Sequence, residues 1–383
     1  MKSARAAFAH AIFGVALFSL FLSSSAPGQN AVQFNSHEVH ANGSITFRYL
    51  DPSASTVLVH LDGVDKPLAL EKGRDGIWSV VTAPLSPEIY GYGFEVDGRS
   101  QLDPRNSAVT PNLVWQGNSV AVSGSVPRPW EARDVSHGVV HHHFYTSKVV
   151  KGLTEGQSEY FVYTPPAYRP KKGQPYPVLY LMHGWSDMAN GWTAVGHAND
   201  ILDNLIAEGK ITPMIVVMPL GYGDMSFVVG GEGGWSDEAA IDRNGSLFSQ
   251  ALLTEIMPQV ESEYHVSRKA DQRAITGLSM GGLESLTIGL GHPELFGWVG
   301  AFSAALGHHE QQQLTSLHGK AASPHLLWIA CGTEDDLISP NRSFVAWLKS
   351  KEVPVTAVET PGMHNWLVWR DNLEHFTPLL FRK

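Results

Sequence analysis

From residue 137 onward, short apolar runs alternate with longer stretches of helical periodicity, and no other feature restricts the fold as strongly. The apolar runs that predict strands are 177–182, 214–218, 273–276 and 325–330. The stretches that predict helices are 199–208, 246–263, 281–289 and 343–351. Strands and helices in this alternation form a mostly parallel sheet with helices on both faces. We therefore predict an α/β domain over 137–383, which begins with a hairpin at 139–149 and 158–164.

The residues before this domain show a different pattern. Alternating apolar residues without a helical period predict strands at 44–50, 56–61, 77–82, 90–96 and 119–122. Asp-Gly and Asp-Pro turn signals separate these runs. Short strands at such spacing predict a small all-β, immunoglobulin-like sandwich over 29–123. The proline-containing, aperiodic residues 124–136 predict a linker between the two domains.

The first residues carry the pattern of a targeting signal. Lys2 and Arg5 precede an uncharged apolar run at 11–22, and small residues follow it. This order is typical of a secretory signal peptide, which we place at 1–28. The run is short for a membrane span, which needs about 20 residues, so an uncleaved anchor is the less favoured alternative. We expect a secreted or periplasmic protein that has no membrane contact after cleavage.

Composition narrows the range of partners. Hydrophobic residues make up 43% of the chain, which is enough for a sizeable core. The formal net charge is −10 and becomes −12 once Lys2 and Arg5 leave with the signal peptide. Since no run of basic residues is present, we expect no binding to nucleic acid. The only cysteine, Cys331, cannot form an internal disulfide, and its apolar surroundings in sequence predict a small buried residue.

A nucleophile motif lies between a predicted strand and a predicted helix. Residues 277–281 read Gly-Leu-Ser-Met-Gly, a G-x-S-x-G sequence in the strand–turn–helix context that a nucleophile elbow requires. Ser279 is therefore the candidate nucleophile. An earlier predicted strand ends in His183-Gly184. In this arrangement the backbone N–H groups of Trp185 and Met280 would form the oxyanion hole.

The acid and base of a catalytic triad should follow the serine in the chain. Three adjacent acidic residues come after the strand at 325–330, namely Glu334, Asp335 and Asp336. Their positions alone leave the choice of acid open. Among the histidines, His364 is best placed, because it lies in a loop directly before the last predicted helix.

Several separated motifs carry a resemblance to a known family. The stretches YLMHGW, DNLIAEGKI, RAITGLSMGG, IACGTEDDLI and GMHNWLVW resemble the esterase D group of α/β-hydrolases. The similarity is greatest to the feruloyl and acetylxylan esterases of carbohydrate esterase family 1. Residues 43–122 resemble, more diffusely, the early-set sandwich of carbohydrate-binding module family 48.

The family resemblance implies an α/β-hydrolase fold and specific roles. It implies Asp335 as the acid and His364 as the base, with no metal or organic cofactor. Trp369 also fits the family pattern. Glu284 departs from it, because many relatives carry glutamine at this position just after the nucleophile.

The acyl pocket is predicted from a long glycine-rich loop at 221–245, since such loops usually shape ligand sites at the carboxyl ends of parallel strands. Aromatic residues of this loop and of nearby motifs could line a pocket for a hydroxycinnamoyl group. They are Trp192, Tyr222, Phe227, Trp235 and Trp366, together with Trp185. In the β-module, Trp115 or Tyr90 could stack on a sugar.

The sequence therefore predicts a secreted serine esterase whose partner is an ester-decorated plant polysaccharide or oligosaccharide. A feruloyl esterase acting on xylan is the first hypothesis, and an acetylxylan esterase, with a smaller pocket, is an alternative. A siderophore or another small ester is a further possible substrate, because the same triad would serve. A catalytically silent glycan-binding protein is the least favoured hypothesis. His141, His142 and His143 alternate across a predicted strand, so we do not expect a metal site there.

Overall fold

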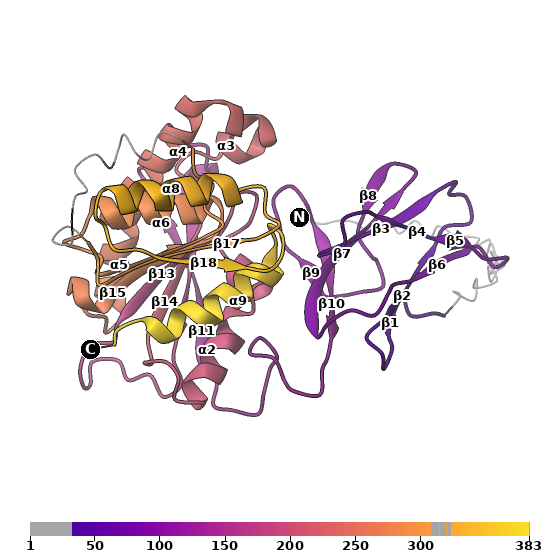
Figure 1. Ribbon diagram of the computed structural model, residues 1–383, viewed down its shortest axis with the longest axis horizontal. Coiled ribbons are helices and arrows are strands. Elements are labelled where there is room, and N and C mark those ends of the chain that lie inside the picture. The colour runs from indigo at the N-terminus through magenta and orange to yellow at the C-terminus, as the bar shows by residue number, and fades with distance from the viewer. Residues whose placement is uncertain (1–32, 308–313, 315–318, 320–322, 383) are drawn as a thin grey trace, which may run out of the picture. The chain divides into compact units, whose positions relative to one another are not determined.

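A central sheet organises the C-terminal part of the chain (Figure 1). The computed structural model describes residues 33–307, 314, 319 and 323–382, so the predicted signal peptide lies outside the described residues. The sheet has eight strands in the order β11-β12-β14-β13-β15-β16-β17-β18. In chain order they are β11 (Val139–Thr146), β12 (Gln157–Thr164), β13 (Val178–Met182), β14 (Ile215–Pro219), β15 (Arg273–Gly277), β16 (Trp298–Phe302), β17 (Leu326–Gly332) and β18 (Thr356–Thr360). The β11–β12 hairpin joins β14 antiparallel, and every pair from β14 to β18 is parallel.

The central strands are buried on both faces, as their continuous apolar sequences predict. Every residue of β13, β14, β15 and β16 is buried. One face packs against α2 (Ala198–Ala207) and α9 (Trp366–Phe376). The other face packs against the helices α4 (Glu238–Ala251), α5 (Met257–Glu263), α6 (Met280–Gly291) and α8 (Ile338–Ser350).

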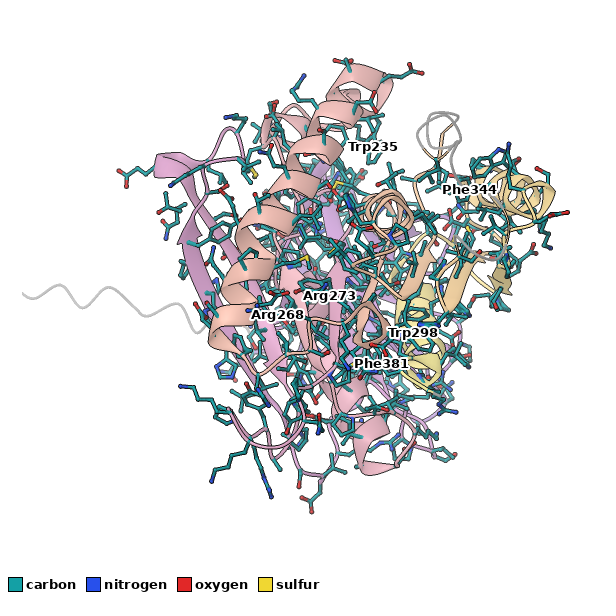
Figure 2. The ribbon with its side chains drawn as sticks, turned by 90° about the vertical axis from the view of Figure 1, so that its left-hand side faces the viewer. Trp235, Arg268, Arg273, Trp298, Phe344 and Phe381 are labelled. Atoms are coloured by element: carbon teal, nitrogen blue, oxygen red, sulfur yellow. The ribbon has the colours of Figure 1, made fainter. Side chains whose placement is uncertain are left out.

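Side chains at the ends of these elements fix the helices to the sheet. Arg273, the first residue of β15, and the exposed Arg268 both pair with Glu261 of α5 (Figure 2). On the other face, Trp298 of β16 contacts Phe381 near the C-terminus, with ring centroids 5.9 Å apart (Figure 2). These contacts lie at the end of the sheet where β15 and β16 begin. A site at the opposite end, where the parallel strands finish, would not disturb them.

The predicted parallel sheet is confirmed, and several of its elements differ from the prediction. β16 and β18 were not among the predicted strands. α4 begins at Glu238, with Asp237 as its N-cap, whereas the predicted helix starts at 246. A π-helical turn over Leu252–Ile256 joins α4 to α5. Of the described residues, none belongs to a helix long and apolar enough to cross a bilayer.

Residues 37–122 form two antiparallel sheets. The first has the order β1-β2-β6-β5, with β1 (His37–Val39), β2 (Ile45–Leu50), β6 (Ile77–Val81) and β5 (Glu71–Lys72). The second has the order β4-β3-β7-β10-β9, with β8 paired to β7. Its strands are β4 (Leu68–Ala69), β3 (Val57–Leu61), β7 (Glu88–Val96), β10 (Gly117–Val122), β9 (Val109–Thr110) and β8 (Arg99–Gln101). A shared apolar core that includes Phe47, Trp78 and Phe94 lies between the two sheets.

All five strands predicted in this region are present, each within two residues of its expected bounds. Residues 35–383 pack as one unit, and the division into a module, a linker and a catalytic domain stays a prediction. The segment predicted as a linker is packed at its centre, because Trp130 is 1% exposed. The resemblance to a carbohydrate-binding module also stays a prediction.

Candidate active site

Ser279 lies on a strained turn between β15 and α6. Its φ of 52° and ψ of −114° are outside the regions that a residue with a side chain normally adopts. Two glycines permit the turn by close backbone contact. A Cβ on Gly277 would lie 2.6 Å from the carbonyl oxygen of Gly281, and one on Gly281 would lie 2.5 Å from the carbonyl oxygen of His183. The G-x-S-x-G pattern therefore reflects the lack of space for a Cβ at Gly277 and Gly281, since neither glycine has a positive φ.

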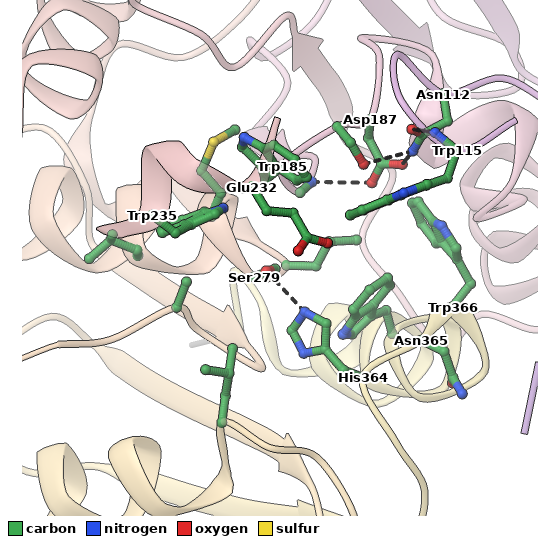
Figure 3. A pocket seen from close by; sticks show the side chains of 18 of the residues that line it. Asn112, Trp115, Trp185, Asp187, Glu232, Trp235, Ser279, His364, Asn365 and Trp366 are labelled. Carbon is green, nitrogen blue, oxygen red and sulfur yellow. Dashed lines mark hydrogen bonds between the residues drawn. The ribbon is translucent and has the colours of Figure 1, made fainter. Parts of the chain in front are cut away.

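The structure brings Ser279, His364 and Asp335 into one hydrogen-bonded chain. His364 Nε2 lies 3.0 Å from Ser279 Oγ (Figure 3). His364 Nδ1 lies 2.9 Å from Asp335 Oδ2. Ser279 follows β15, Asp335 follows β17, and His364 follows β18, so all three come from the carboxyl ends of parallel strands. This is the end of the sheet at which α/β proteins place their ligand sites.

The environment of Asp335 distinguishes it from its acidic neighbours. Asp335 is 2% exposed, whereas Glu334 and Asp336 are both exposed. Burial by itself raises the pKa of the Asp335 carboxyl, but the hydrogen bond and charge of His364 and the backbone N–H of Leu337 outweigh it and hold the pKa below its usual value. Because Asp335 is an ionised acceptor, it favours a proton on His364 Nδ1. His364 Nε2 is then free to accept the proton of Ser279.

Two backbone N–H groups remain the candidates for the oxyanion hole. Met280 is the first residue of α6, and Trp185 follows the end of β13. Neither N–H has an acceptor within the described part of the chain. The first N–H groups of a helix are unpaired within the helix itself, which makes the N-terminus of α6 suited to an anion.

A buried histidine fixes the loop that contains Trp185. His183 Nδ1 donates to the carbonyl oxygen of Gly184 over 2.7 Å, and Nε2 accepts from the N–H of Gly221 over 2.8 Å. Burial lowers the pKa of His183 to about 4, so the ring is neutral at physiological pH. Neutral His183 thus links the candidate oxyanion loop to the start of the loop at 221–245.

A cavity of about 1400 Å³ opens onto Ser279 and His364. Large aromatic rings make up much of its wall; they belong to Trp115, Trp185, Phe227, Trp235, Trp366 and Trp369 (Figure 3). Phe227, Trp235 and Trp366 therefore line the cavity, as the sequence predicts. A drug-sized ligand typically occupies a pocket of about 300–1,000 Å³, so this cavity has room for an aromatic acyl group and part of its alcohol.

Trp192 and Tyr222, also predicted for this pocket, do not line it. Both side chains have 0% exposure. Trp192 Nε1 donates to the carbonyl oxygen of Met182, and Tyr222 Oη donates to that of Asp187. Each ring buries its apolar surface in the core while its single polar atom finds a backbone acceptor, and this is the physical reason for the correction.

Sequence reasoning missed the contribution of the N-terminal strands to this cavity. Trp115 and Asn112 reach it from the segment between β9 and β10, and Asp62 reaches it from the end of β3. The sequence suggested Trp115 only for stacking on a sugar. No local signal could have placed these residues beside Ser279, because more than 150 positions separate them in the chain.

The Asp, Glu, Lys and Arg side chains that line the cavity are all of one sign. Among the described residues that line it, several are acidic and none is lysine or arginine. The acidic residues are Asp62, Asp65, Asp187, Glu232, Glu238, Asp242 and Glu284. Burial raises the pKa of Asp62, Asp187 and Glu284, so these three contribute less to the negative charge than the other four. A cavity of this kind disfavours an anionic ligand and accommodates a neutral one.

Other candidate groups have different environments. Burial raises the pKa of Cys331 to about 12, so this thiol is not a nucleophile. Each of the three consecutive histidines has its own partner rather than a common ligand. His141 contacts Thr164, His142 contacts Glu159, and His143 contacts Tyr264.

Comparison with known proteins identifies the family of the chain. Residues 153–379, more than half of the chain, match the Esterase family, described as "Putative esterase". An endo-1,4-β-xylanase/feruloyl esterase of Xylanibacter ruminicola is 30% identical over 359 residues, which cover 93% of this chain and 46% of the relative. The chain thus spans about half the length of that relative.

Two solved structures share the fold. A family 1 ferulic acid esterase from Anaeromyces mucronatus matches with a TM-score of 0.56 and 24% identity, over 67% of this chain and 96% of that one. An enterobactin esterase from Shigella flexneri matches with a TM-score of 0.67 and 17% identity, over 91% of this chain and 96% of that one. These likenesses identify the sheet and its helices as an α/β-hydrolase fold.

Proposed function

Because the chain belongs to the Esterase family and is a serine-type carboxylic ester hydrolase of the α/β-hydrolase fold, we propose that it removes hydroxycinnamoyl groups, such as feruloyl, from plant xylan. The observation that supports a hydroxycinnamoyl acyl group is the large aromatic-walled cavity beside Ser279. An acetyl group would leave most of this space unfilled. A planar aromatic acyl group can bury both of its faces against the tryptophan rings.

In the first half of the proposed reaction, Ser279 Oγ attacks the ester carbonyl carbon while His364 Nε2 takes its proton. Asp335 keeps the other ring proton on Nδ1 and stabilises the imidazolium that forms. The carbonyl oxygen becomes an oxyanion, which accepts hydrogen bonds from the N–H groups of Trp185 and Met280. Each such donor contributes about 3–4 kcal/mol to transition-state stabilisation. The C–O bond then breaks, and the alcohol leaves with the proton from His364.

In the second half, water replaces the alcohol. His364 Nε2 removes a proton from the water, and the oxygen attacks the acyl-enzyme carbonyl in the same oxyanion hole. Collapse of this second tetrahedral intermediate returns the proton to Ser279 Oγ and releases the carboxylic acid. Apart from this water, the step uses only groups of the chain itself.

The same proposal includes xylan as the polysaccharide and export of the protein from the cell. The relative from Xylanibacter ruminicola combines a xylanase name with a feruloyl esterase name, which supports a xylan-derived substrate. The acidic cavity suits a neutral sugar ester. The basic start and apolar run of residues 1–28 support export, as action on a plant polymer outside the cell requires.

A second candidate substrate is a catechol-bearing siderophore ester. The likeness to the enterobactin esterase favours it, because that match includes the N-terminal strands and covers 91% of this chain. The charge of the cavity weighs against it. Complexes of iron(III) with three catecholates are anionic, and no described lysine or arginine lines the cavity to bind them.

The test compares three substrates with one blank. Release of acid from methyl ferulate, acetylated xylan and ferric enterobactin is measured with the wild-type protein and with Ser279→Ala. We expect ferulate release, little acetate release, and a loss of about 10⁴-fold or more in kcat for Ser279→Ala at unchanged Tm. Retained turnover in the variant would overturn the role of Ser279. Acetate release or enterobactin cleavage in place of ferulate release would overturn the proposed acyl group.

A further inference from the structure

A segment of the N-terminal region lies directly on the loop that contains Trp185. The N–H of Leu113 donates to the carbonyl oxygen of Ser186 over 2.7 Å. The Asn112 side-chain Nδ2 donates to Ser186 Oγ over 3.0 Å and to Asp187 Oδ1 over 3.1 Å (Figure 3). Three hydrogen bonds therefore connect residues 112–113 to residues 186–187, although these pairs are more than 70 positions apart.

The backbone that these bonds hold is strained. Ser186 has a φ of 71°, in the left-handed region that residues with a side chain rarely adopt. Such a conformation persists only where surrounding contacts hold it in place, and its cost is about 1–3 kcal/mol. Ser186 directly follows Trp185, so a relaxation of this residue would change the path of the loop on which the Trp185 N–H lies.

We propose that Asn112 is a positioning residue for ester hydrolysis, which holds the loop 185–187 so that the Trp185 N–H faces the oxyanion. This inference rests on the proposed function, because it assumes that Trp185 and Ser279 act as described above. It makes residues 112–113 part of the catalytic apparatus. A module that only brings the enzyme to a polymer would not affect the cleavage of a small soluble ester.

Both polar atoms of the Asn112 side-chain amide form hydrogen bonds. Its Oδ1 accepts from the N–H of Val114 over 2.9 Å and from the N–H of Trp115 over 2.8 Å. This turn holds Trp115 against Trp185, with ring centroids 5.3 Å apart. The oxygen thus shapes the local turn, while the nitrogen makes the connection to Ser186 and Asp187. The two functions can be separated by substitution.

The partner of Asn112 is a buried carboxyl group. Asp187 is 6% exposed, and its Oδ2 accepts from the N–H of Gly184 over 3.4 Å. Asp187 therefore spans the loop, from Gly184 before Trp185 to Asn112 beyond it. Loss of the Asn112 donor leaves one oxygen of a buried carboxyl group without its partner, which is costly for the loop.

Asn112→Asp is the decisive variant. An aspartate keeps the oxygen that accepts from Val114 and Trp115, but it replaces the donor to Asp187 with a second carboxyl oxygen. On methyl ferulate and on 4-nitrophenyl acetate we expect kcat to fall about 10- to 100-fold, while KM changes less than about 2-fold. Since 4-nitrophenyl acetate carries only an acetyl group, a loss on both substrates does not arise from the aromatic pocket.

Two further variants control this experiment. Val114→Asp adds the same charge to the same segment on a side chain that is 41% exposed and does not line the cavity, so kcat should stay at the wild-type value. The double variant Asn112→Asp/Asp187→Asn exchanges donor and acceptor. Its new amide can still donate across the contact, and kcat should recover to within about 3-fold of the wild type.

The outcomes separate this inference from the proposed function. A wild-type kcat per active site in Asn112→Asp would overturn the positioning role, and so would a loss that the exchange variant does not recover. Turnover in Ser279→Ala would instead overturn the proposed function. If Asn112→Asp does not fold, Asn112→Ser keeps a hydroxyl acceptor for the turn but is too short to reach Asp187. It should lower kcat without raising KM, and a wild-type kcat would again overturn the inference.

Discussion

Glu284 is a buried acidic residue next to the turn that carries Ser279. The surroundings of this one side chain determine its pKa. Its side chain lies on α6, is 3% exposed, and neither carboxyl oxygen has a hydrogen-bond partner among the described residues. Burial raises its pKa well above the ordinary value of 4.5, so the folded protein keeps this proton to a higher pH than the unfolded chain does. Above pH 4.5 the unfolded chain loses this proton while the folded chain keeps it. The free energy of unfolding therefore falls as pH rises.

Glu284→Gln removes this pH-dependent cost and keeps the shape of the side chain. We expect the variant to gain stability over the wild type with rising pH, by up to about 1.4 kcal/mol for each pH unit above 4.5. Calorimetric Tm values at pH 5 and pH 8 measure this gain. Glu71→Gln, on an exposed residue of β5, serves as the control and should show no such difference. A gain in Tm at pH 5 that equals the gain at pH 8 would contradict the protonated state of Glu284.

Single residues also show where sequence reasoning about the site succeeds and fails. Ser279 and His364 could be chosen because their roles require a fixed order in the chain and a fixed structural context. Position in the chain alone leaves three candidates for the acid, and the family resemblance implies Asp335. In the structure Asp335 is the candidate that is hydrogen-bonded to His364. The prediction for Trp192 and Tyr222 is wrong because the neighbouring sequence of an aromatic residue in a loop does not reveal whether its ring faces a cavity or the core.

At the scale of the element, the turn from β15 into α6 depends on the absence of side chains at two positions. A Cβ on Gly281 would lie 2.6 Å from Met182 Cβ and 2.5 Å from the carbonyl oxygen of His183. It would therefore push the end of β13 away from the elbow, and with it the loop that carries Trp185.

Gly281→Ala is expected to cost about 1–3 kcal/mol of stability through overpacking and to lower kcat about 100-fold through misplacement of the oxyanion loop. Gly291→Ala is the matched control, because a Cβ at this last residue of α6 meets no atom within 4 Å. An alanine there should leave kcat unchanged and raise stability by up to about 1 kcal/mol. Urea unfolding and ester kinetics on both variants measure these effects. Equal behaviour of the two variants would show that the close contact at Gly281 is not required.

Strongly patterned elements could be predicted, and weakly patterned ones could not. β13 and β14 are continuous apolar runs, and the alternating strands of residues 37–122 were equally clear. β18 reads Thr-Ala-Val-Glu-Thr and is largely exposed at the edge of the sheet, so it has no apolar run to reveal it. The start of α4 was missed because Asn244-Gly245 resembles a turn signal. In the structure Gly245 lies within the helix, where an added Cβ would meet no atom within 4 Å, and the N-cap of this helix is Asp237.

At the scale of the whole molecule, a buried ion pair connects the N-terminal sheets to the α/β-hydrolase fold. Arg370 of α9 is 1% exposed and lies 3.0 Å from Glu88 at the start of β7. The same guanidinium donates to the carbonyl oxygens of Ile89 and Val195. It also lies 5.8 Å from the ring centre of Trp130, in the segment predicted as a linker. These contacts explain why residues 35–383 pack as one unit.

Removal of the arginine alone should be far more harmful than removal of both charges. Burial raises the pKa of Glu88 to about 7 even beside Arg370. Arg370→Met leaves this buried carboxyl group without its cation and is expected to cost about 3–5 kcal/mol. In the double variant Glu88→Gln/Arg370→Met this unpaired charge is absent, so part of the loss should be regained. Denaturant unfolding of both single variants and the double variant gives the coupling energy. If the effects of the two substitutions simply add, the ion pair does not link the two regions.

The acidic lining of the cavity has a consequence for the end of each catalytic cycle. Ester cleavage converts a neutral reactant into a carboxylic acid, which ionises as soon as it is in contact with water at neutral pH. If the chain carries out the proposed reaction, the walls that accept the neutral ester then repel the carboxylate product. The charge of the cavity would therefore assist product departure, and accumulated acid would compete poorly with fresh ester for the same space.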